Sequence, residues 1–260
     1  GPSTERSSGP APLAPELDEA LARRVGGADL FPLRSQSRVL PHAVNNEELE
    51  LRTEEFRERT GEPPRGRNKR RLKAEVRDEL LPKAMLRSDR TWGYFDLGEK
   101  LLAVDAAQEA AAERFLRRLQ ATNDRLQCRP LACKRPFADL LNSIFLGGAP
   151  QQFAVGRECK MQDAVEKGSV VRWANFDLSD RSIRDHVANG MRLTHLGIVY
   201  DNVMSCVIDE NGVFTKVKFL GMDEDGDRPE DALARLDAEF VLLTGTVRHL
   251  LDDVEKLLGK

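Results

Sequence analysis

The longest regular pattern of apolar and polar residues lies near the end of the chain, between residues 233 and 257. Apolar side chains recur there every three or four residues, with charged and polar residues between them. Because an α-helix turns once in about 3.6 residues, this spacing gathers the apolar side chains on one side of a helix. The stripe consists of Leu233, Leu236, Phe240, Leu243, Val247, Leu250, Val254 and Leu257. We predict one long amphipathic helix, packed on the body of the protein or at a subunit interface, and favour the former.

Three segments rich in β-forming residues precede this helix and predict an antiparallel meander. They cover about residues 191–200, 203–209 and 213–220, and the joint Glu210-Asn211-Gly212 is a strong hairpin signal. In the third segment, strand alternation predicts that Lys216 and Lys218 share one face. Earlier in this region we expect a strand at residues 170–176 and a helix that Ser179 caps and Gly190 ends.

The first half of the chain predicts two charged helices that fold back on each other. The first is expected after a cap at Asn45-Asn46 and runs to Arg59, and the second covers about residues 68–87. The turn Gly61–Gly66 (GEPPRG) joins them into an αα-hairpin. The apolar stripe of the first helix is thin, so we expect the hairpin to project from a larger body.

Weaker signals predict the remaining elements. Residues 91–96 and 100–104 flank a glycine turn and indicate a β-hairpin, after which Asp105 is expected to cap an alanine-rich helix. The opening residues 1–15 are small, polar and proline-rich, so we expect them to be flexible. A short helix is expected from Pro15 to Val25, ended by two glycines.

Together these patterns predict an α+β fold. We expect a projecting helical hairpin on a mixed α/β body with an antiparallel meander and a long C-terminal amphipathic helix. The boundaries follow from the turn signals, including Gly147-Gly148-Ala149-Pro150. The expected parts are a flexible or divergent N-terminal segment (1–37), the helical hairpin (38–87), a central α+β domain (88–149) and a base-like α+β domain (150–260).

Positive charge is concentrated in one short stretch. The chain has 260 residues and a formal net charge of -3, yet residues 65–77 hold Arg65, Arg67, Lys69, Arg70, Arg71, Lys73 and Arg77. A local basic run on a slightly acidic protein indicates a polyanion-binding face. A basic helix side suits contacts to nucleic-acid phosphates, which give affinity without sequence readout. The alternative is a solvated helix surface that binds nothing.

Residue types used in catalysis and metal binding are present but scattered. The four histidines show no metal-ligand spacing, and the four cysteines form no Cys-x-x-Cys motif. There is no Walker loop and no Gly-x-Ser-x-Gly elbow. An acidic loop lacks the spacing of a Ca²⁺-binding EF-hand loop; its acids are Asp223, Glu224, Asp225 and Asp227. We therefore expect a binding protein rather than an enzyme, with no catalytic residue, no metal and no cofactor.

The composition also bears on the compartment. No apolar run approaches the roughly 20 residues of a membrane span, and no signal-type apolar block opens the chain. Unpaired cysteines in a chain of this size suit a reducing compartment. We expect a cytoplasmic protein.

Short motifs from residue 38 onward match one known family in their order and spacing. In the first half they are Arg38-Val39-Leu40-Pro41, Leu72-Lys73-Ala74-Glu75-Val76, Leu80-Leu81-Pro82-Lys83-Ala84, Leu101-Leu102-Ala103-Val104-Asp105 and Arg129-Pro130-Leu131. In the second half they are Gly168-Ser169-Val170-Val171-Arg172, Asp177-Leu178-Ser179, Lys216-Val217-Lys218-Phe219, Leu236-Asp237-Ala238-Glu239-Phe240 and Leu242-Leu243-Thr244-Gly245. With these motifs the chain resembles the bacterial recombination-associated RdgC family.

The resemblance implies an α+β protein that dimerises into a closed ring, with a positively charged hole that encircles duplex DNA. It implies single- and double-stranded DNA and a second copy of the chain as partners, a restraint on RecA-driven strand exchange, and a place at the nucleoid. In that picture the helical hairpin is the tip that helps to close the ring, and residues 150–260 form the base. The family's strand-rich N-terminal portion is not recognisable in residues 1–37, so we expect a shortened or divergent N-terminal region.

Charge and resemblance together give the expected site. The residues expected to contact DNA phosphates are Arg65, Arg67, Lys69, Arg70, Arg71, Lys73, Lys83 and Arg87. Weaker candidates on strands are Arg172, Lys216 and Lys218, for which an ordinary solvent-facing charge is an equal explanation. Two other functions stay open. One is a Mg²⁺-dependent nuclease that uses dispersed acids, such as Asp96, Asp105 and Asp177. The other is a protein-interaction module whose final helix binds a partner without any DNA.

Overall fold

The chain folds into an α+β structure of two compact units. The computed structural model describes residues 6–11, 20–106, 108–166, 168–221 and 231–260. The first unit runs to residue 24 and from 29 to 127, and the second comprises residues 25–28 and 128–260. Each unit has its own antiparallel sheet and its own core. The expected division into four parts is finer than these units and stays a prediction.

The sheet of the first unit pairs strands from both sides of the helical hairpin. Its strands are β1 (Arg6–Pro10), β2 (Arg23–Val25), β3 (Ala28–Val39), β4 (Met85–Asp96) and β5 (Leu101–Val104), in the order β1-β3-β4-β5 with β2 also paired to β3. Helix α3 (Glu109–Thr122) places Phe115 against Phe31 and closes a small core with Leu33. A Cβ at Gly93 would lie 2.5 Å from the Phe115 ring, so this strand position admits only glycine if the helix is to approach so closely.

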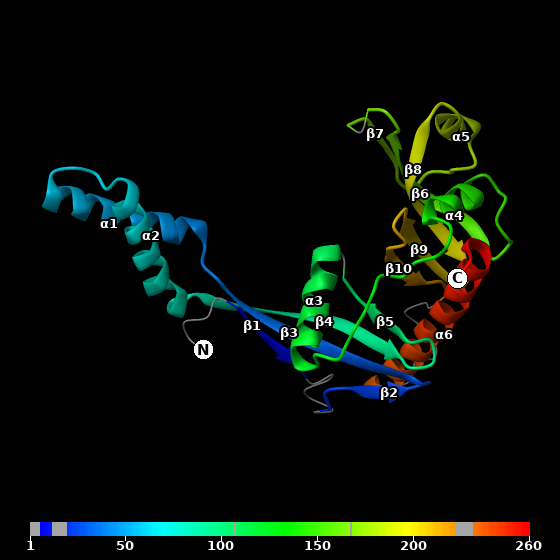
Figure 1. Ribbon diagram of the computed structural model, residues 1–260, viewed down its shortest axis with the longest axis horizontal. Helices are drawn as coiled ribbons and strands as arrows, with labels where there is room; N and C mark the ends of the chain where they lie inside the picture. Colours follow the sequence, from blue (N-terminus) through cyan, green and yellow to red (C-terminus); the bar gives the residue numbers. More distant parts are fainter. Residues whose placement is uncertain (1–5, 12–19, 107, 167, 222–230) are drawn as a thin grey trace. The chain divides into compact units, whose positions relative to one another are not determined.

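The helical hairpin connects β3 to β4. It consists of α1 (His42–Thr60), α2 (Gly66–Leu80) and the short 3-10 helix η1 (Leu81–Lys83). Figure 1 shows α1 and α2 at one end of the long strands β3 and β4. Because these strands are neighbours in one sheet, the chain enters and leaves the hairpin side by side.

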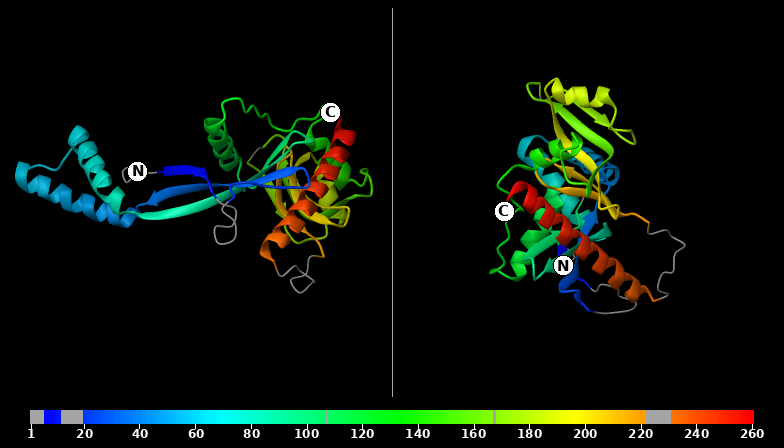
Figure 2. Two further views of the ribbon diagram at one scale, coloured as in Figure 1. Left: turned by 90° about the horizontal axis from the view of Figure 1, so that it is seen from below. Right: turned by 90° about the vertical axis from the view of Figure 1, so that its right-hand side faces the viewer.

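The second unit is a five-stranded sheet with helices on one face. Its strands are β6 (Phe153–Asp163), β7 (Val170–Trp173), β8 (Met191–Tyr200), β9 (Met204–Asp209) and β10 (Phe214–Phe219), in the order β10-β9-β8-β6-β7. The helices are α4 (Phe137–Phe145), α5 (Arg181–Ala188) and α6 (Ala232–Leu258). Their apolar side chains form one core with the inward residues of the strands, among them Met161, Leu196 and Ile198. Figure 2 shows α6, orange to red, running alongside this sheet. The opposite face of the sheet is here called the open face.

The predicted α+β class, the helical hairpin, the meander and the long C-terminal helix are confirmed. Leu250, Val254 and Leu258 place the second half of α6 in the core, which is the packing that we favoured. Elements that the sequence did not predict include strand β3, strand β6 and helix α4. No helix among the described residues is long and apolar enough to cross a membrane.

The expectations for the N-terminal segment were wrong where they can be compared. Residues 6–10 are not flexible but pair with β3, from Arg6 opposite Ser37 to Pro10 opposite Leu33. Residues 23–25 form a strand instead of the end of a helix, and the start of that expected helix lies outside the described residues. These short strands are held by backbone hydrogen bonds to β3, which is distant in sequence from β1. Such pairing needs no apolar pattern in the short strand, so the sequence did not indicate it.

Several expected helix ends were also wrong. Helix α1 begins at His42, before the expected asparagine cap, and α2 ends at Leu80 because Pro82 lies in the next turn. Helix α3 begins only at Glu109, so Asp105 is not its cap. At α5 the capping side chain is that of Asp180, which accepts the backbone N–H of Ser182, and not that of Ser179.

A polar network ties α6 to the sheet of the second unit. The Asp253 carboxylate accepts hydrogen bonds from the Tyr200 hydroxyl at 2.8 Å and the Gln152 amide at 3.1 Å, and pairs with Lys256 at 2.9 Å. The hydrogen bond from Lys256 has the largest effect on the pKa of Asp253 and lowers it, while burial opposes this effect. The bonds from Tyr200 and Gln152 lower the pKa further, so that it lies below its ordinary value of 3.8. Burial, and after it the hydrogen bond to Asp253 and the charge of that carboxylate, raise the pKa of Tyr200.

We predict that Asp253→Asn reduces the acid sensitivity of the second unit. A carboxylate whose pKa is lowered by folding stabilises the folded state above its ordinary pKa, and this contribution is lost as the pH falls through the lowered value. Urea unfolding followed by circular dichroism between about pH 7 and about pH 3 should therefore show a shallower loss of stability in the variant. Asp252→Asn removes the neighbouring carboxylate as a control, and equal curves for Asp253→Asn and the wild type would contradict the prediction.

Candidate polyanion-binding surface

The two helices of the hairpin contact each other through a stripe of mixed polarity. On α1 the half-buried positions step at helical spacing along Asn45, Glu48, Leu49, Arg52, Thr53 and Phe56, and none is fully buried. On the other side Leu72 and Val76 of α2 are buried, as is Leu81 of η1. So few buried apolar side chains leave the association of the helices dependent on polar contacts as well.

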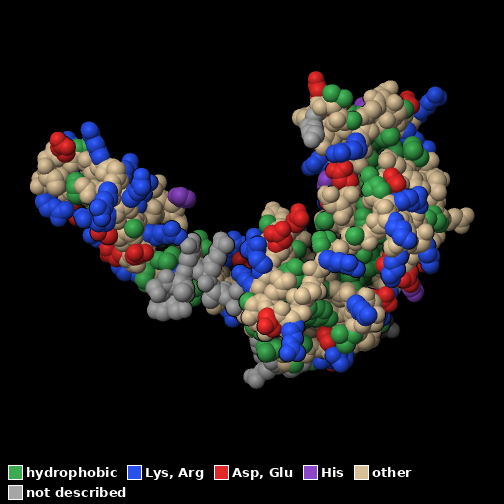
Figure 3. All heavy atoms as spheres, in the orientation of Figure 1, with side chains coloured by type: hydrophobic (Ala, Val, Ile, Leu, Met, Phe, Trp, Pro, Cys, Tyr) green, Lys and Arg blue, Asp and Glu red, His purple; other side chains and the backbone are tan. Residues whose placement is uncertain are grey.

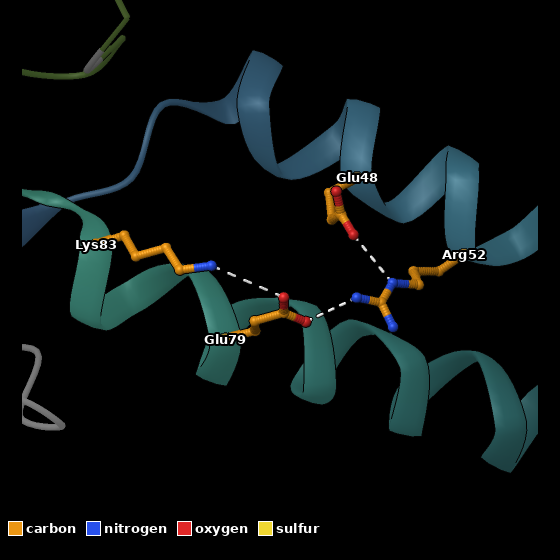
Figure 4. Close-up of polar contacts among 4 residues, drawn as sticks. All are labelled: Glu48, Arg52, Glu79 and Lys83. Carbon is orange, nitrogen blue, oxygen red and sulfur yellow. Dashed lines mark hydrogen bonds and ion pairs between the residues drawn. The ribbon is translucent and has the colours of Figure 1, made fainter.

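Arg52 links the two helices (Figure 4). Its guanidinium donates to Glu48 on its own helix at 2.9 Å and to Glu79 on α2 at 2.7 Å. These contacts raise the pKa of Arg52, first through the hydrogen bond to Glu48 and then through the charge of Glu79. Lys83 lies 3.9 Å from the other oxygen of Glu79. Two acids of the hairpin are therefore occupied in holding the helices together.

A second arginine anchors the hairpin to the sheet. Arg38, near the end of β3, donates from Nη1 to the carbonyl oxygens of Leu81, Pro82 and Ala84 at 3.3, 2.8 and 3.4 Å. These carbonyls lie where η1 passes into β4. Two of the sequence motifs noted above, 38–41 and 80–84, thus meet at the base of the hairpin.

The basic residues of α2 lie on its exposed side, away from α1. Figure 3 shows Lys and Arg side chains gathered over the hairpin that Figure 1 labels α1 and α2. Arg71 is 3.3 Å from Glu75, a weak pair between exposed side chains. Within the basic run 65–77, the cations for which the described part of the chain offers no ion pair are Arg65, Arg67, Lys69, Arg70 and Lys73.

These five cations lie at the positive end of their helix. The N-cap residue of α2 is Arg65, whose side chain accepts no hydrogen bond, and the first turn holds no acidic residue. The first N–H groups of a helix lack intrahelical partners and carry a partial positive charge, so acids and not bases favour this position. Lysines and arginines gathered here work against helix stability and together create a site that attracts anions.

The structure brings together only part of the expected set. Arg65 to Lys73 form one surface on α2, whereas Lys83 belongs to η1 and pairs with Glu79. Arg87 is on β4, not on a helix as expected, and lies 3.2 Å from Asp89. The strand candidates Arg172, Lys216 and Lys218 belong to the second unit. Arg77, on the same helix, was left out of the predicted set although its exposed position on α2 could have indicated it.

The two lysines of β10 do not share one face in the expected way. Lys216 has a left-handed backbone with φ 53°, and the pairing of β10 with β9 shifts between Thr215 and Lys218. This bulge breaks the alternation, so Lys216, Val217 and Lys218 are all exposed. The Lys216 ammonium is bound to the Glu158 carboxylate at 2.8 Å.

Among the residues that the structure describes, the acids considered for metal binding do not form a cluster. Asp96 accepts the N–H groups of Gly98 and Glu99, and Asp177 accepts those of Ser179 and its hydroxyl. Over the ranges that the structure describes, no three His, Cys, Asp or Glu residues are placed to hold a metal ion. The acidic loop with Asp223 to Asp227 lies outside those ranges.

Comparison with known proteins gives one consistent family. The family described as "Putative exonuclease, RdgC" matches residues 2–260. The recombination-associated protein RdgC of Xanthomonas campestris pv. campestris (strain B100) is 32% identical over 252 residues, which cover 94% of this chain and 81% of that protein. The proteins of the same name from Stenotrophomonas maltophilia (strain R551-3) and Xylella fastidiosa (strain M23) are 30% and 31% identical, over 92% of this chain and 81% of each relative. The family match therefore includes the N-terminal segment, residues 1–37, from residue 2 onward, where the sequence motifs showed no resemblance to the family.

The unfavourable start of α2 leads to a prediction about stability. Replacing Arg65 by aspartate places a capping acid at a residue whose backbone is already extended, with φ -121° and ψ 158°. The new side chain can accept an N–H of the first turn and complement the helix dipole, which together stabilise helices by about 1 kcal/mol or more. Urea unfolding should show that the free energy of unfolding rises by about 1 kcal/mol for Arg65→Asp. Arg65→Ala, which removes the charge without adding a capping group, should change it less. A less stable Arg65→Asp protein would show that Arg65 makes a stabilising contact.

Proposed function

We propose, on the premise that this chain belongs to the RdgC family, that it binds DNA without sequence preference through the phosphate groups. As a homodimeric ring it would encircle duplex DNA at the nucleoid and modulate RecA-dependent recombination. The relatives are named recombination-associated proteins, and recombination takes place on DNA. Single-stranded DNA carries the same phosphates and is expected to bind as well.

The observation that carries this proposal is the exposed, acid-free start of α2. Arg65, Arg67, Lys69, Arg70 and Lys73 have no acidic partner among the residues described, and they lie at the positive N-terminal end of a helix. This arrangement costs stability in the free protein, and a phosphate would relieve both the mutual repulsion and the unfavourable helix end. Such features are retained where a ligand needs them.

The chemistry of this surface favours the DNA backbone over the bases. Its side chains are lysines and arginines, which form charge-assisted hydrogen bonds to phosphate oxygens. Phosphate contacts are alike for every sequence, and each releases condensed counterions, so affinity falls steeply as salt rises.

A second feature of the first unit supports self-association. Apolar side chains remain exposed on α1 and at the base of the hairpin: Val39, Val44, Leu51, Met85 and Leu86, the last three with 58%, 76% and 59% of their surface exposed. Exposed apolar groups that gather on one part of a protein mark interaction sites. In a homodimer the hairpins of two copies would bury these side chains against each other and bring two basic surfaces to one DNA duplex.

Charge reversal at the start of α2 tests the DNA-binding proposal. We predict that the triple variant Lys69→Glu, Arg70→Glu and Lys73→Glu binds labelled duplexes of several sequences at least about tenfold more weakly at low salt, and that its salt dependence is flatter. Fluorescence anisotropy at several salt concentrations measures both. Arg65→Asp should also lose affinity, although we expect that variant to be more stable than the wild type.

The matched control reverses three arginines elsewhere in the first unit, Arg114→Glu, Arg117→Glu and Arg125→Glu. It changes the net charge by the same amount, so a general electrostatic effect would weaken both triple variants equally. Equal affinities of the two variants would contradict the assignment to α2. Incubating the labelled duplex with Mg²⁺ tests the nuclease alternative in the same experiment, since shortening of the labelled strand would establish cleavage.

The apolar surface gives a separate prediction about the dimer. Leu51→Glu places a charge on the exposed side of α1, where it costs the monomer little, but it would be buried between two hairpins in a dimer. Light scattering after gel filtration should show a dimeric wild type. The variant should already dissociate into monomers at protein concentrations roughly tenfold or more above those at which the wild type does. Glu50→Gln, at the neighbouring exposed position, serves as the control. A wild type that is monomeric at all concentrations would contradict the ring.

A further inference from the structure

The open face of the second sheet holds two cations and a histidine in a row across neighbouring strands. In the strand register Arg172 of β7 lies opposite Lys160 of β6, and Lys160 lies opposite His195 of β8. Side chains directly opposite each other in antiparallel strands have Cβ atoms about 5 Å apart. Their strand neighbours Cys159, Met161 and Leu196 point into the core, so this row faces the opposite, helix-free side.

The two cations of the row form no ion pair with an acid that the structure describes. Neither Lys160 nor Arg172 forms an ion pair with any residue described, and like charges in opposite positions destabilise a sheet. The nearby acids are engaged elsewhere. Glu158 is bound by Lys216, and Glu210 lies 3.3 Å from Arg192.

Asp209 ends the row beyond His195, on β9. It lies opposite His195 in the register, but its Oδ1 accepts the N–H groups of Asn211 and Val213 in the following turn. The row thus runs from two unpaired cations, through a histidine, to a carboxylate that already accepts two hydrogen bonds. This gives the Arg172 end of the open face a local excess of positive charge.

The hydrogen bonds of His195 determine which nitrogen can take up a proton. The Thr194 hydroxyl donates its one hydrogen to the Lys160 carbonyl at 3.1 Å. It can therefore only accept from His195 Nδ1, which lies 3.1 Å from it. Nδ1 carries the hydrogen in neutral His195, and Nε2 is the nitrogen left to bind a proton.

Burial and four charged groups act on the pKa of His195. Burial lowers the pKa of His195 most, followed by the charge of Lys160, and Arg172 lowers it further. Asp209 and Glu210 raise the pKa, but their effects do not overcome the others. His195 is therefore neutral in the free protein near pH 7, and an anion that offsets Lys160 and Arg172 would favour its protonation.

We propose that Arg172, Lys160 and His195 form a second phosphate-binding row on the second sheet, and that His195 takes up a proton from solvent at Nε2 when a DNA phosphate binds there. This inference rests on the proposed function, because it assigns the row to the same ligand as α2. It adds Lys160 and His195 to the one residue of the row, Arg172, that the sequence indicated. It also makes part of the DNA affinity dependent on pH.

The charge of the row is tested with the full chain and a short labelled duplex. The double variant Lys160→Gln and Arg172→Gln removes two cations, so the slope of log affinity against log salt should decrease by about two. The control is Lys134→Gln and Arg181→Gln, two exposed residues of the same unit that are outside the row. Circular dichroism and thermal unfolding establish that each variant is folded.

The histidine is tested by lowering the pH from about 8 to about 5.5, across the ordinary histidine pKa. The wild type should gain about three- to tenfold more affinity for the duplex over this range than His195→Gln, because binding is coupled to uptake of one proton. The imidazole NMR signals of His195 should also show a higher pKa with the duplex bound than without it.

The outcomes separate this inference from the proposed function. If the wild type fails to bind the duplex at low salt, the proposed function fails. If it binds, but the Lys160 and Arg172 variant has the same salt slope as its control, the row is no phosphate site and the inference is overturned. An unchanged slope with an altered molecular mass would identify the row as a contact between copies, and equal pH responses of wild type and His195→Gln would exclude the proton uptake.

Discussion

The basic residues at the start of α2 repel one another, and the structure of the hairpin has to compensate for this repulsion. Five cations lie within the first turns of this helix, where the helix dipole is itself positive and no acid or cap compensates. A short helix with this charge pattern would be a poor helix in isolation. It is held by other parts of the first unit: the buried Leu72 and Val76, the Arg52 links to Glu48 and Glu79, and the anchor from Arg38.

That support explains how the hairpin can present its charge at a defined place. The helices are inserted between β3 and β4, two paired strands of twelve residues each, so both ends of the hairpin are fixed by one sheet. Some acids of α1 and α2 are used between the helices or along one helix, as with Glu79 and Glu75. The cations at the start of α2 are left for a ligand, and the exposed apolar groups nearby are left for a second copy of the chain.

The sequence predicted the elements that depend on local pattern. The stripe of α6 and the glycine and asparagine turns of the meander each specify one element without reference to the rest of the chain. Strand β6 was missed because its pairing with β8 shifts at two places, which removes the simple alternation from Phe153 to Asp163. The five buried apolar side chains of helix α4 do recur at helical spacing, so the sequence carries a signal for this short element that our prediction did not use.

The position of the candidate site could be predicted from the sequence, but the contacts of its residues could not. The run of cations on α2 is contiguous in sequence, so its position could be predicted, but the missing cap at Arg65 and the ion pairs of Arg71, Lys83 and Arg87 depend on the fold. The row of Arg172, Lys160 and His195 brings together residues from three strands through their register. Register across strands is decided by the packing of the core and leaves no signal in one strand's own sequence.

Hydrogen–deuterium exchange of α2, measured with and without bound duplex, tests the central claim most directly. Among the first N–H groups of this helix, that of Asn68 donates to the Arg65 carbonyl at 3.1 Å. The N–H groups before it lack an intrahelical acceptor and exchange quickly in the free protein. If phosphates bind at this helix end, exchange should slow in residues 66–73 on saturation with duplex, while peptides from α3 in the same unit keep their rates. A protein that binds the duplex with unchanged exchange in residues 66–73 would contradict the assignment of the DNA contact to α2.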